Sequence, residues 1–322
     1  MKLLHYKEGS KYRLGCLVGD YVVDLSRSWR DYIKIEGLGN NKGKIPSDMI
    51  EFLKAGREYL RNVKRVIRFA KGLIKKEEFN TGFIFNAEKV KFGPPVLNPG
   101  KIICIGLNYR DHCAEQGVKI PKVPIIFSKF STAIIGHNDF VVKPSLTEKL
   151  DYEAELAFVI GKEGRWINEK DWLKYVAGYT IMNDISARDI QFSDGQWVRG
   201  KTFDTFAPIG PYIVTTDEIK DPHNLVIQLT LNGEIMQNSN TSNLIFGIPQ
   251  LVSFLSNVMT LKPGDIVTTG TPPGVGIFRE PPVLLKHSDQ IEIYIEKIGK
   301  LRNMVIDESF YKKQISVMST VI

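Results

Sequence analysis

The segment LDYEAELAFVI, residues 150–160, decides the fold class, because its side chains alternate as they do in a β-strand. Asp151, Glu153 and Glu155 would share one face of that strand. The same face continues as Ala157 and Val159, which is typical of a strand buried on both sides. A solvated polar face would explain the first half of the segment but not the second. We therefore expect the acids to point into a cleft or the core.

Acids enclosed in this way need a compensating charge. Ionised carboxylates that lie close together in an apolar setting repel each other, and the segment contains no Lys or Arg. A divalent metal would resolve this, since carboxylates are typical ligands of Mg²⁺, Mn²⁺ and Ca²⁺. Asp184, at the end of the β-rich run 176–184, is either a third ligand or a turn residue. Spacing alone leaves both the metal site and the solvated face open.

Short β-rich runs dominate the chain beyond residue 100, which predicts a mostly β domain. They cover residues 102–105, 125–127, 140–142, 153–160, 179–182, 212–215, 226–231, 266–269 and 290–295. Residues 92–100 contain three prolines and two glycines, which disfavour regular structure and suit a boundary. We therefore expect a small α+β domain over residues 1–95 and a larger domain over residues 96–322.

The N-terminal part combines strand and helix signals. Residues 12–25 are expected to form two strands joined by a two-residue turn, and a loop is expected over residues 37–44. Ser47 is a candidate N-cap for a helical stretch that runs towards Lys75, with a break near Gly56. Basic and apolar residues alternate in the second part of this stretch, as expected for an amphipathic helix whose basic face is exposed to solvent.

Composition limits the partners and the compartment. The 322 residues are 43% hydrophobic and 25% charged, which is globular usage, and the net charge of +7 comes without an aromatic-interleaved basic stripe. Three cysteines without C-x-x-C spacing favour a reducing cytoplasm. No apolar run reaches about 18 residues. We expect a cytoplasmic protein that binds neither nucleic acid nor membranes.

Residues 195–202 match the phosphate-loop pattern G-x-x-x-x-G-K-[ST]. That loop works only between a strand and a helix whose N-terminus meets the phosphates. Here a polar segment precedes the match, and Pro208 and Pro211 follow it. The sequence context therefore excludes a phosphate loop.

A His–Glu pair is the other candidate for chemistry. His112 and Glu115 are three residues apart, hence neighbours on one face of a helix, so that Glu115 could orient a basic imidazole. An exposed polar helix start fits the same spacing. Cys113 has no nearby oxyanion motif, and we interpret it as a packed thiol.

Taken together, six segments resemble the fumarylacetoacetate hydrolase family. They are NPGKIICIGLNYRDHCAEQG (98–117), PIIFSKFSTAIIG (124–136), LDYEAELAFVIG (150–161), GYTIMNDISARDIQ (178–191), GKTFDTFAPIGP (200–211) and LKPGDIVTTGTPPGVG (261–276). The resemblance implies a mixed α/β, predominantly β chain with a β-roll-like catalytic domain, usually a homodimer, and a smaller α+β domain before it.

The resemblance also implies a metal site. Mg²⁺ or Mn²⁺, with Ca²⁺ as an alternative, would be held by Glu153, Glu155 and Asp184, which leaves Asp151 as a bystander at the mouth of the strand. Larger relatives have a further aspartate upstream of the histidine, for which residues 106–108 offer no equivalent.

The remaining roles that the resemblance implies fall on His112 and Glu115 as the His–Glu pair, Gln191 as the substrate-facing glutamine, Lys201 as the lysine, and Thr271 and Arg188 as supporting residues. The chain departs from the shorter members at Phe130, where they have proline. This departure puts a role for the neighbouring Lys129 in doubt.

These residues predict chemistry on a small anionic 2-oxo acid. Cleaving the C–C bond of an acylpyruvate or a fumarylacetoacetate-like substrate leaves an enolate that a metal stabilises, while His112 activates water. We therefore predict a metal-dependent C–C hydrolase. Oxaloacetate decarboxylation, 2-oxo acid dehydration and keto–enol or hydroxymuconate-type isomerisation use the same enolate and stay as alternatives, as does a non-catalytic metabolite-binding protein.

Overall fold

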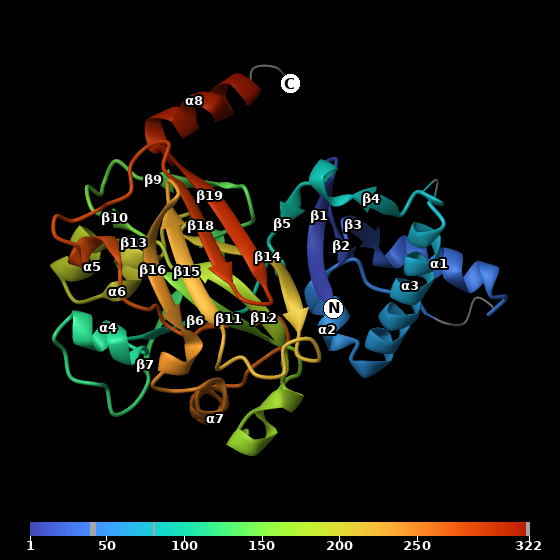
Figure 1. Ribbon diagram of the computed structural model, residues 1–322, viewed down its shortest axis with the longest axis horizontal. Helices are drawn as coiled ribbons and strands as arrows, with labels where there is room; N and C mark the ends of the chain where they lie inside the picture. Colours follow the sequence, from blue (N-terminus) through green and yellow to red (C-terminus); the bar gives the residue numbers. More distant parts are fainter. Residues whose placement is uncertain (39–42, 80, 320–322) are drawn as a thin grey trace.

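The computed structural model describes residues 1–38, 43–79 and 81–319, so the loop expected over residues 37–44 lies partly outside it. The predicted fold class, mixed α/β and predominantly β, is confirmed (Figure 1). The largest sheet has the strand order β4 (Ile84–Asn86), β3 (Tyr21–Asp24), β2 (Lys11–Val18), β1 (Lys2–Glu8), β14 (Ala207–Thr215), β12 (Val176–Asn183), β11 (Ala154–Ile160), β17 (Ile266–Thr268), β6 (Ile102–Gly106), β7 (Ile125–Lys129).

The described part of the chain also contains two further sheets, eight α-helices and five short 3-10 helices. The second sheet has the order β16 (Glu234–Asn240), β15 (Val226–Leu231), β18 (Gln290–Ile295), β19 (Gly299–Asp307), β9 (Phe140–Lys143), and β10 (Leu150–Asp151) pairs with β13 (Ser186–Ala187). The helices are α1 (Leu25–Ile35), α2 (Met49–Lys54), α3 (Arg57–Lys75), α4 (Arg110–Glu115), α5 (Arg188–Ser193), α6 (Trp197–Lys201), α7 (Ile248–Val258) and α8 (Glu308–Ser319). No helix in these residues is long and apolar enough to cross a membrane.

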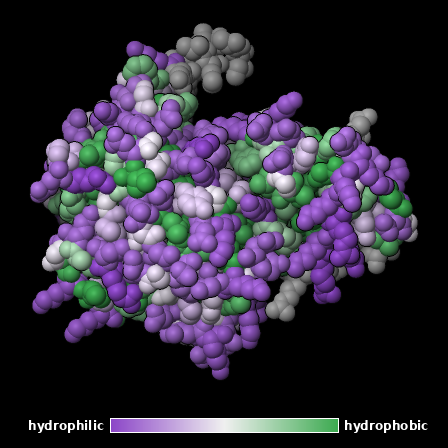
Figure 2. All heavy atoms as spheres, in the orientation of Figure 1, coloured by the Kyte–Doolittle hydropathy of each residue, from purple (hydrophilic) through white to green (hydrophobic). Residues whose placement is uncertain are grey.

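The N-terminal signals are largely confirmed. Strands β2 and β3 form the expected hairpin, and the break at Gly56, whose φ is +77°, separates α2 from α3. The predicted cap is wrong by one residue, since the carboxylate of Asp48, rather than Ser47, accepts the first free N–H groups of α2. The apolar face of α3 is buried, and Figure 2 shows hydrophilic side chains gathered over the side of the molecule where α3 lies.

The two expected domains share one sheet. Strand β1 pairs with β14, with Lys2 opposite Val214, so the N-terminal strands extend the sheet of the larger part (Figure 1). Residues 92–100 are not wholly irregular, because Phe92–Gly93 form β5, which pairs with β1. The division at residue 95 therefore stays a prediction, although the sheet runs across it.

The segment 150–160 is not one strand, which corrects the expectation of three acids on one face. Leu150 and Asp151 form β10, which pairs with β13, and a new strand, β11, begins at Ala154. Every residue of β11 is buried, because β12 and β17 flank it and apolar side chains cover both faces. The prediction of a strand buried on both sides is confirmed for β11, whereas Glu153 lies in the two-residue link between β10 and β11.

Candidate functional site

Three acids in or next to two neighbouring strands meet in a buried cluster. Glu155 lies in β11, Glu153 lies just before it, and Asp184 directly follows β12, where Asn183 pairs with Ala154. One carboxylate oxygen from each residue lies within 4.8 Å of the others, and all three side chains are buried. The expectation that these acids face an enclosed site is confirmed.

Within the described residues, three cations from other segments compensate the cluster, in addition to any metal that the acids hold. Lys129 donates to Asp184 Oδ1 at 2.5 Å, and Lys201 donates to Asp184 Oδ2 at 3.0 Å and Glu153 Oε2 at 2.8 Å. Arg188 Nη1 lies 2.7 Å from Glu153 Oε1. Lys129 therefore belongs to the site despite the neighbouring phenylalanine. These cations come from β7, α6 and α5, so a local sequence window does not contain them.

The compensation is uneven. Burial works against the ionisation of Glu153, but Lys201 and Arg188 outweigh it and lower the pKa of Glu153 to about 2. Burial, together with the charges of Asp184 and Glu153, raises the pKa of Glu155 well above its usual value. Within the described residues no ion pair joins Glu155 to a cation. Glu155 is therefore the acid of the cluster whose charge is least compensated.

The donor set fits a hard divalent cation. Carboxylate oxygens are the ligands that such cations prefer, and an oxygen that accepts one hydrogen bond keeps lone-pair capacity for a metal. Together with Asp151, the buried group contains four acids and three cations, hence a formal charge of −1 when all are ionised. One dication would change this charge to +1, which suits an anionic ligand. Glu153, Glu155 and Asp184 can therefore hold a metal ion.

Asp151 is not a bystander at the mouth of the strand, which corrects the interpretation from the sequence. Its side chain is fully buried and accepts hydrogen bonds from Arg188 Nε at 2.9 Å and from the backbone N–H groups of Gly276 and Ile277 at 2.7 and 3.1 Å. These bonds fix the guanidinium of Arg188, while its Nη2 is buried without a hydrogen-bond partner in the described part of the chain. Asp151 positions Arg188.

The His–Glu pair forms as predicted. In α4, His112 Nδ1 lies 2.8 Å from Glu115 Oε2, and Glu115 Oε1 accepts the N–H of Gly274 at 2.8 Å. Asp111 anchors the helix, since its Oδ2 accepts from Ser239 Oγ at 2.6 Å and from Asn243 Nδ2 at 3.0 Å. The imidazole is thus held on a fixed support.

Two other interpretations of the sequence are also borne out. Cys113 is a packed thiol, buried with its Sγ against the carbonyl of Leu107, and burial raises its pKa. The phosphate-loop match is accidental, because α6 lies inside the motif and its Lys201 turns into the acid cluster.

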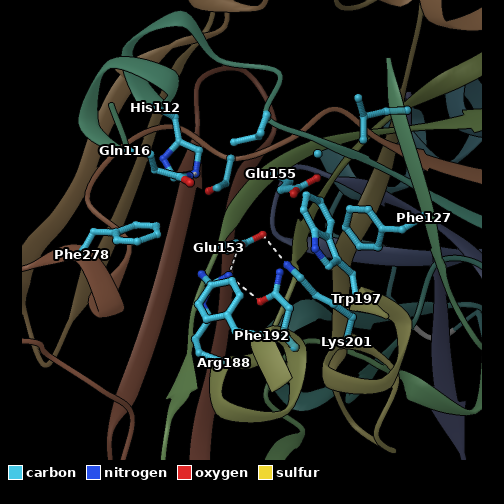
Figure 3. A pocket seen from close by; sticks show the side chains of 15 residues that line it. His112, Gln116, Phe127, Glu153, Glu155, Arg188, Phe192, Trp197, Lys201 and Phe278 are labelled. Atoms are coloured by element: carbon cyan, nitrogen blue, oxygen red, sulfur yellow. Dashed lines mark hydrogen bonds and ion pairs between the residues drawn. The ribbon is translucent and has the colours of Figure 1, made fainter. Parts of the chain in front are cut away.

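One pocket brings these groups together (Figure 3). It is lined by His112, Glu153, Glu155, Arg188, Gln191, Lys201 and Thr271 from the predicted set, and by Ile105, Gly106, Leu107, Gln116, Phe127, Phe192, Trp197 and Phe278, which the sequence did not indicate. Gln191 accepts from Arg188 Nη1 at 3.0 Å, and Thr271 Oγ1 donates to the carbonyl of Ala154 at 3.1 Å. The aromatic residues that line the pocket come from separate segments, so no short sequence motif predicts them.

Comparisons with known proteins identify the family of this chain. Residues 101–306 match the family model described as fumarylacetoacetate (FAA) hydrolase C-terminal. The chain is 47% identical over 263 residues to the mitochondrial oxaloacetate tautomerase Fahd2a of Rattus norvegicus, a match that covers 81% of this chain and 80% of the relative. The chain therefore belongs to the fumarylacetoacetate hydrolase family.

Solved structures give the same fold at 30% identity. Fumarylacetoacetate hydrolase from Exiguobacterium antarcticum aligns with a TM-score of 0.77, covering 96% of this chain and 100% of its own. The 2-hydroxyhepta-2,4-diene-1,7-dioate isomerase of Mycobacterium marinum aligns with a TM-score of 0.71, covering 96% of this chain and 99% of its own. The relatives named here are enzymes with different reactions, so the reaction of this chain has to be argued from its site.

Proposed function

We propose that this protein is an oxaloacetate tautomerase, which interconverts the keto and enol forms of a small dicarboxylic 2-oxo acid. The observation that carries the proposal is that one base, His112, and Arg188, whose Nη2 has no hydrogen-bond partner among the described residues, line a single pocket beside an acid triad. The tautomerase name of the rat relative supports this reaction over the C–C hydrolysis expected from the sequence.

Substrate binding is assigned to the cationic and amide groups. We assign Arg188 Nη2 to a substrate carboxylate, because a buried guanidinium N–H without a partner gains a charge-assisted hydrogen bond there. Lys201 and Gln191 line the same pocket and would donate to the oxygen on C2, where negative charge develops. Mg²⁺ or Mn²⁺ held by Glu153, Glu155 and Asp184 would supply positive charge beside this oxygen.

His112 is assigned the proton transfer. Because Glu115 only accepts hydrogen bonds when ionised, Nδ1 carries the proton and Nε2 of the neutral ring is the basic nitrogen. Nε2 takes a proton from C3 of the keto form, the C–H electron pair forms the C2–C3 double bond, and the C2–O π pair becomes a lone pair on the oxygen. The imidazolium then gives its proton to solvent and the oxygen takes one from solvent, which restores neutral His112. The reverse sequence returns the keto form. No water or other reactant is consumed.

Decarboxylation of oxaloacetate is the second candidate, because it passes through the enolate of pyruvate and the same acid triad would serve it. It breaks the C3–C4 bond and needs no base at C3. The position of His112 at the pocket therefore favours tautomerisation. Hydrolysis of an acylpyruvate also uses His112 and is the third arm of the test.

The test follows enol-oxaloacetate, pyruvate and acetylpyruvate in parallel, with purified protein and Mg²⁺. We expect the enol absorbance to approach its keto–enol equilibrium faster than without protein, with little pyruvate formed and acetylpyruvate left intact. Pyruvate formed as fast as enol is lost would assign decarboxylation instead. Absence of any acceleration would overturn the proposal.

Assembly and compartment stay predictions. We propose the homodimer that the family resemblance implies. The cytoplasmic location expected from the cysteines competes with the mitochondrial location printed in the rat relative's name. Fractionation of the native cells would decide between the two compartments.

A further inference from the structure

Gln116 directly follows helix α4 and lines the candidate pocket. Its side-chain Nε2 lies 2.6 Å from Nε2 of His112, the nitrogen that we assign as the base. Figure 3 shows the amide of Gln116 beside the imidazole at the rim of the pocket. Neither the sequence motifs nor the comparisons assign a role to this residue.

The chemistry of the two partners fixes the direction of this hydrogen bond. With the amide nitrogen facing the ring, as in this structure, the amide donates and His112 Nε2 is the acceptor, which requires a ring without a proton at Nε2. At the other ring nitrogen, the carboxylate of Glu115 accepts, so Nδ1 must carry the proton. Gln116 and Glu115 therefore select the same state of His112, the neutral Nδ1–H tautomer with its Nε2 lone pair available.

The same side chain also matches the protonated ring. Once Nε2 has taken a proton it becomes a donor, and an amide N–H opposite it would leave two donors facing each other. Turning the amide over by about 180° places its Oε1 there as an acceptor. A methionine has a similar shape but makes neither hydrogen bond, whereas an ionised glutamate makes only the second.

We propose that Gln116 is a positioning residue for proton transfer, which holds the Nε2 lone pair of neutral His112 at the pocket and turns its amide to accept from Nε2 once the proton has moved. This inference rests on the proposed function, because it gives His112 the role of base. It adds that the base has a partner suited to both of its states and that the substrate must displace the amide from Nε2.

The test must separate this role from a structural one and from failure of the proposed function. We would follow the ¹³C and ¹⁵N ring signals of the histidines, of which the chain has five, in the Mg²⁺-loaded protein without substrate. The signal of His112 is identified by its absence in His112→Ala. The ¹⁵N shifts report the tautomer, and a pH titration reports the pKa of His112 whether or not oxaloacetate is the substrate.

Other charges act on this titration as well. Glu115 and Asp111 lie on the same helix as His112, and Glu153 lines the same pocket. Phe278 also faces the imidazole, with 6.4 Å between the two ring centroids, but it carries no charge. These groups are unchanged in the variants, so a difference between variants reports residue 116. Gln250→Glu is the matched control, because Gln250 is exposed on α7 and a glutamate can still accept the N–H of Gly247.

We expect the Nδ1–H tautomer in the unmodified protein. Gln116→Glu should raise the pKa of His112 by about one unit and move the acid limb of kcat/KM upwards by the same amount. Gln116→Met should leave that pKa within about 0.3 units while kcat falls about tenfold and KM changes little. Gln250→Glu should change none of these.

Three results would overturn the inference. The first is the Nε2–H tautomer in the unmodified protein. The second is a pKa of His112 that Gln116→Glu moves no further than Gln250→Glu does, in variants with unchanged melting temperature. The third is a kcat that Gln116→Met leaves unchanged. If the NMR results hold but oxaloacetate is not tautomerised, Gln116 keeps its role and only the assigned reaction is wrong.

Discussion

Two buried acidic groups in this molecule differ in how completely they are satisfied. In the N-terminal part, the carboxylate of Asp24 is fully buried and accepts hydrogen bonds from Tyr6 Oη at 2.6 Å, Arg13 Nε at 2.5 Å and the backbone N–H of Arg27 at 2.7 Å. One anion meets one guanidinium, and the carboxylate also caps α1. Such a group completes its own charge balance.

The pocket cluster lacks both a complete charge balance and a complete set of hydrogen-bond partners. It contains one more acid than cations, Glu155 has no ion pair in the described part of the chain, and Arg188 Nη2 has no hydrogen-bond partner there. A metal ion and an anionic substrate would supply the missing partners. The difference shows why burial alone does not identify a site, whereas burial combined with an incomplete charge balance does.

The largest expected effect separates the two groups by activity. His112→Ala should lower kcat for enol conversion about 10³-fold, because it removes the proton-transferring group, while Mg²⁺ affinity stays unchanged. Asp24→Ala should leave kcat of the folded protein near the starting value. The comparison fails if His112→Ala converts enol-oxaloacetate at the original rate.

For stability, the larger effect is expected from the N-terminal acid rather than from the pocket. Asp24→Ala should lower the free energy of unfolding by about 3 kcal/mol, because it removes the cap of α1 and leaves Arg13 and Tyr6 without their acceptor. Urea unfolding followed by circular dichroism measures this change. A loss well below 1 kcal/mol would mean that Asp24 is not the balanced structural group described here.

Glu155→Gln tests the pocket cluster by removing a charge while nearly keeping the shape of the side chain. Mg²⁺ affinity measured by calorimetry should fall about a hundredfold, since a ligand is lost. The free energy of unfolding without metal should stay the same or rise by up to about 1 kcal/mol, because a carboxylate repelled by Asp184 and Glu153 has been neutralised. A large loss of stability with unchanged affinity would contradict the metal assignment.

The pH dependence of metal binding follows from the same residue. The raised pKa of Glu155 means that protons compete with a metal for this carboxylate at a higher pH than for an ordinary glutamate, so metal binding below that pKa releases a proton. Below that pKa, Mg²⁺ affinity should therefore rise by up to about tenfold per pH unit. Glu153, with a pKa of about 2, contributes no pH dependence to the Mg²⁺ affinity above about pH 4. Calorimetry in buffers of different ionisation enthalpy counts the released proton, and a count of zero would refute the pKa assignment.

The smallest expected effect concerns the support of the base. Asp111→Ala removes the acceptor for Ser239 and Asn243, so α4 should spend less time in the position seen here and KM should rise about threefold. Steady-state kinetics measures this rise. Ser242→Ala is the control, because Ser242 is next to Asn243 and exposed, whereas the side-chain hydrogen bonds to Asp111 Oδ2 come from Ser239 and Asn243. An equal effect of both variants would remove the proposed role of Asp111.

Local chemistry decided which parts of the site the sequence could predict. Glu153, Glu155, Asp184, His112 and Glu115 lie in short motifs whose spacing survives folding, and all nine β-rich runs contain strands. The family resemblance placed Lys201 and Arg188 at the site, but their pairing with the acids and the part played by Lys129 could not be predicted, because these cations come from segments brought together only by the fold.

Two errors have local physical reasons. The second N-terminal strand was expected to reach Leu25, but Asp24 caps α1, so the helix begins at Leu25. The single strand expected over residues 150–160 breaks because Asp151 turns to bind Arg188 and two backbone N–H groups instead of continuing the alternation. In both places, a side chain that bonds backbone N–H groups overrides the strand pattern.

The most direct test of the account is hydrogen–deuterium exchange at C3 of oxaloacetate, followed by proton NMR in D₂O with catalytic protein and Mg²⁺. If His112 moves a proton between C3 and solvent on one face of the substrate, deuterium should enter C3 faster than without protein and stereospecifically, without matching release of carbon dioxide, and His112→Ala should abolish the acceleration. Exchange at the protein-free rate, or equal acceleration by His112→Ala, would contradict the account.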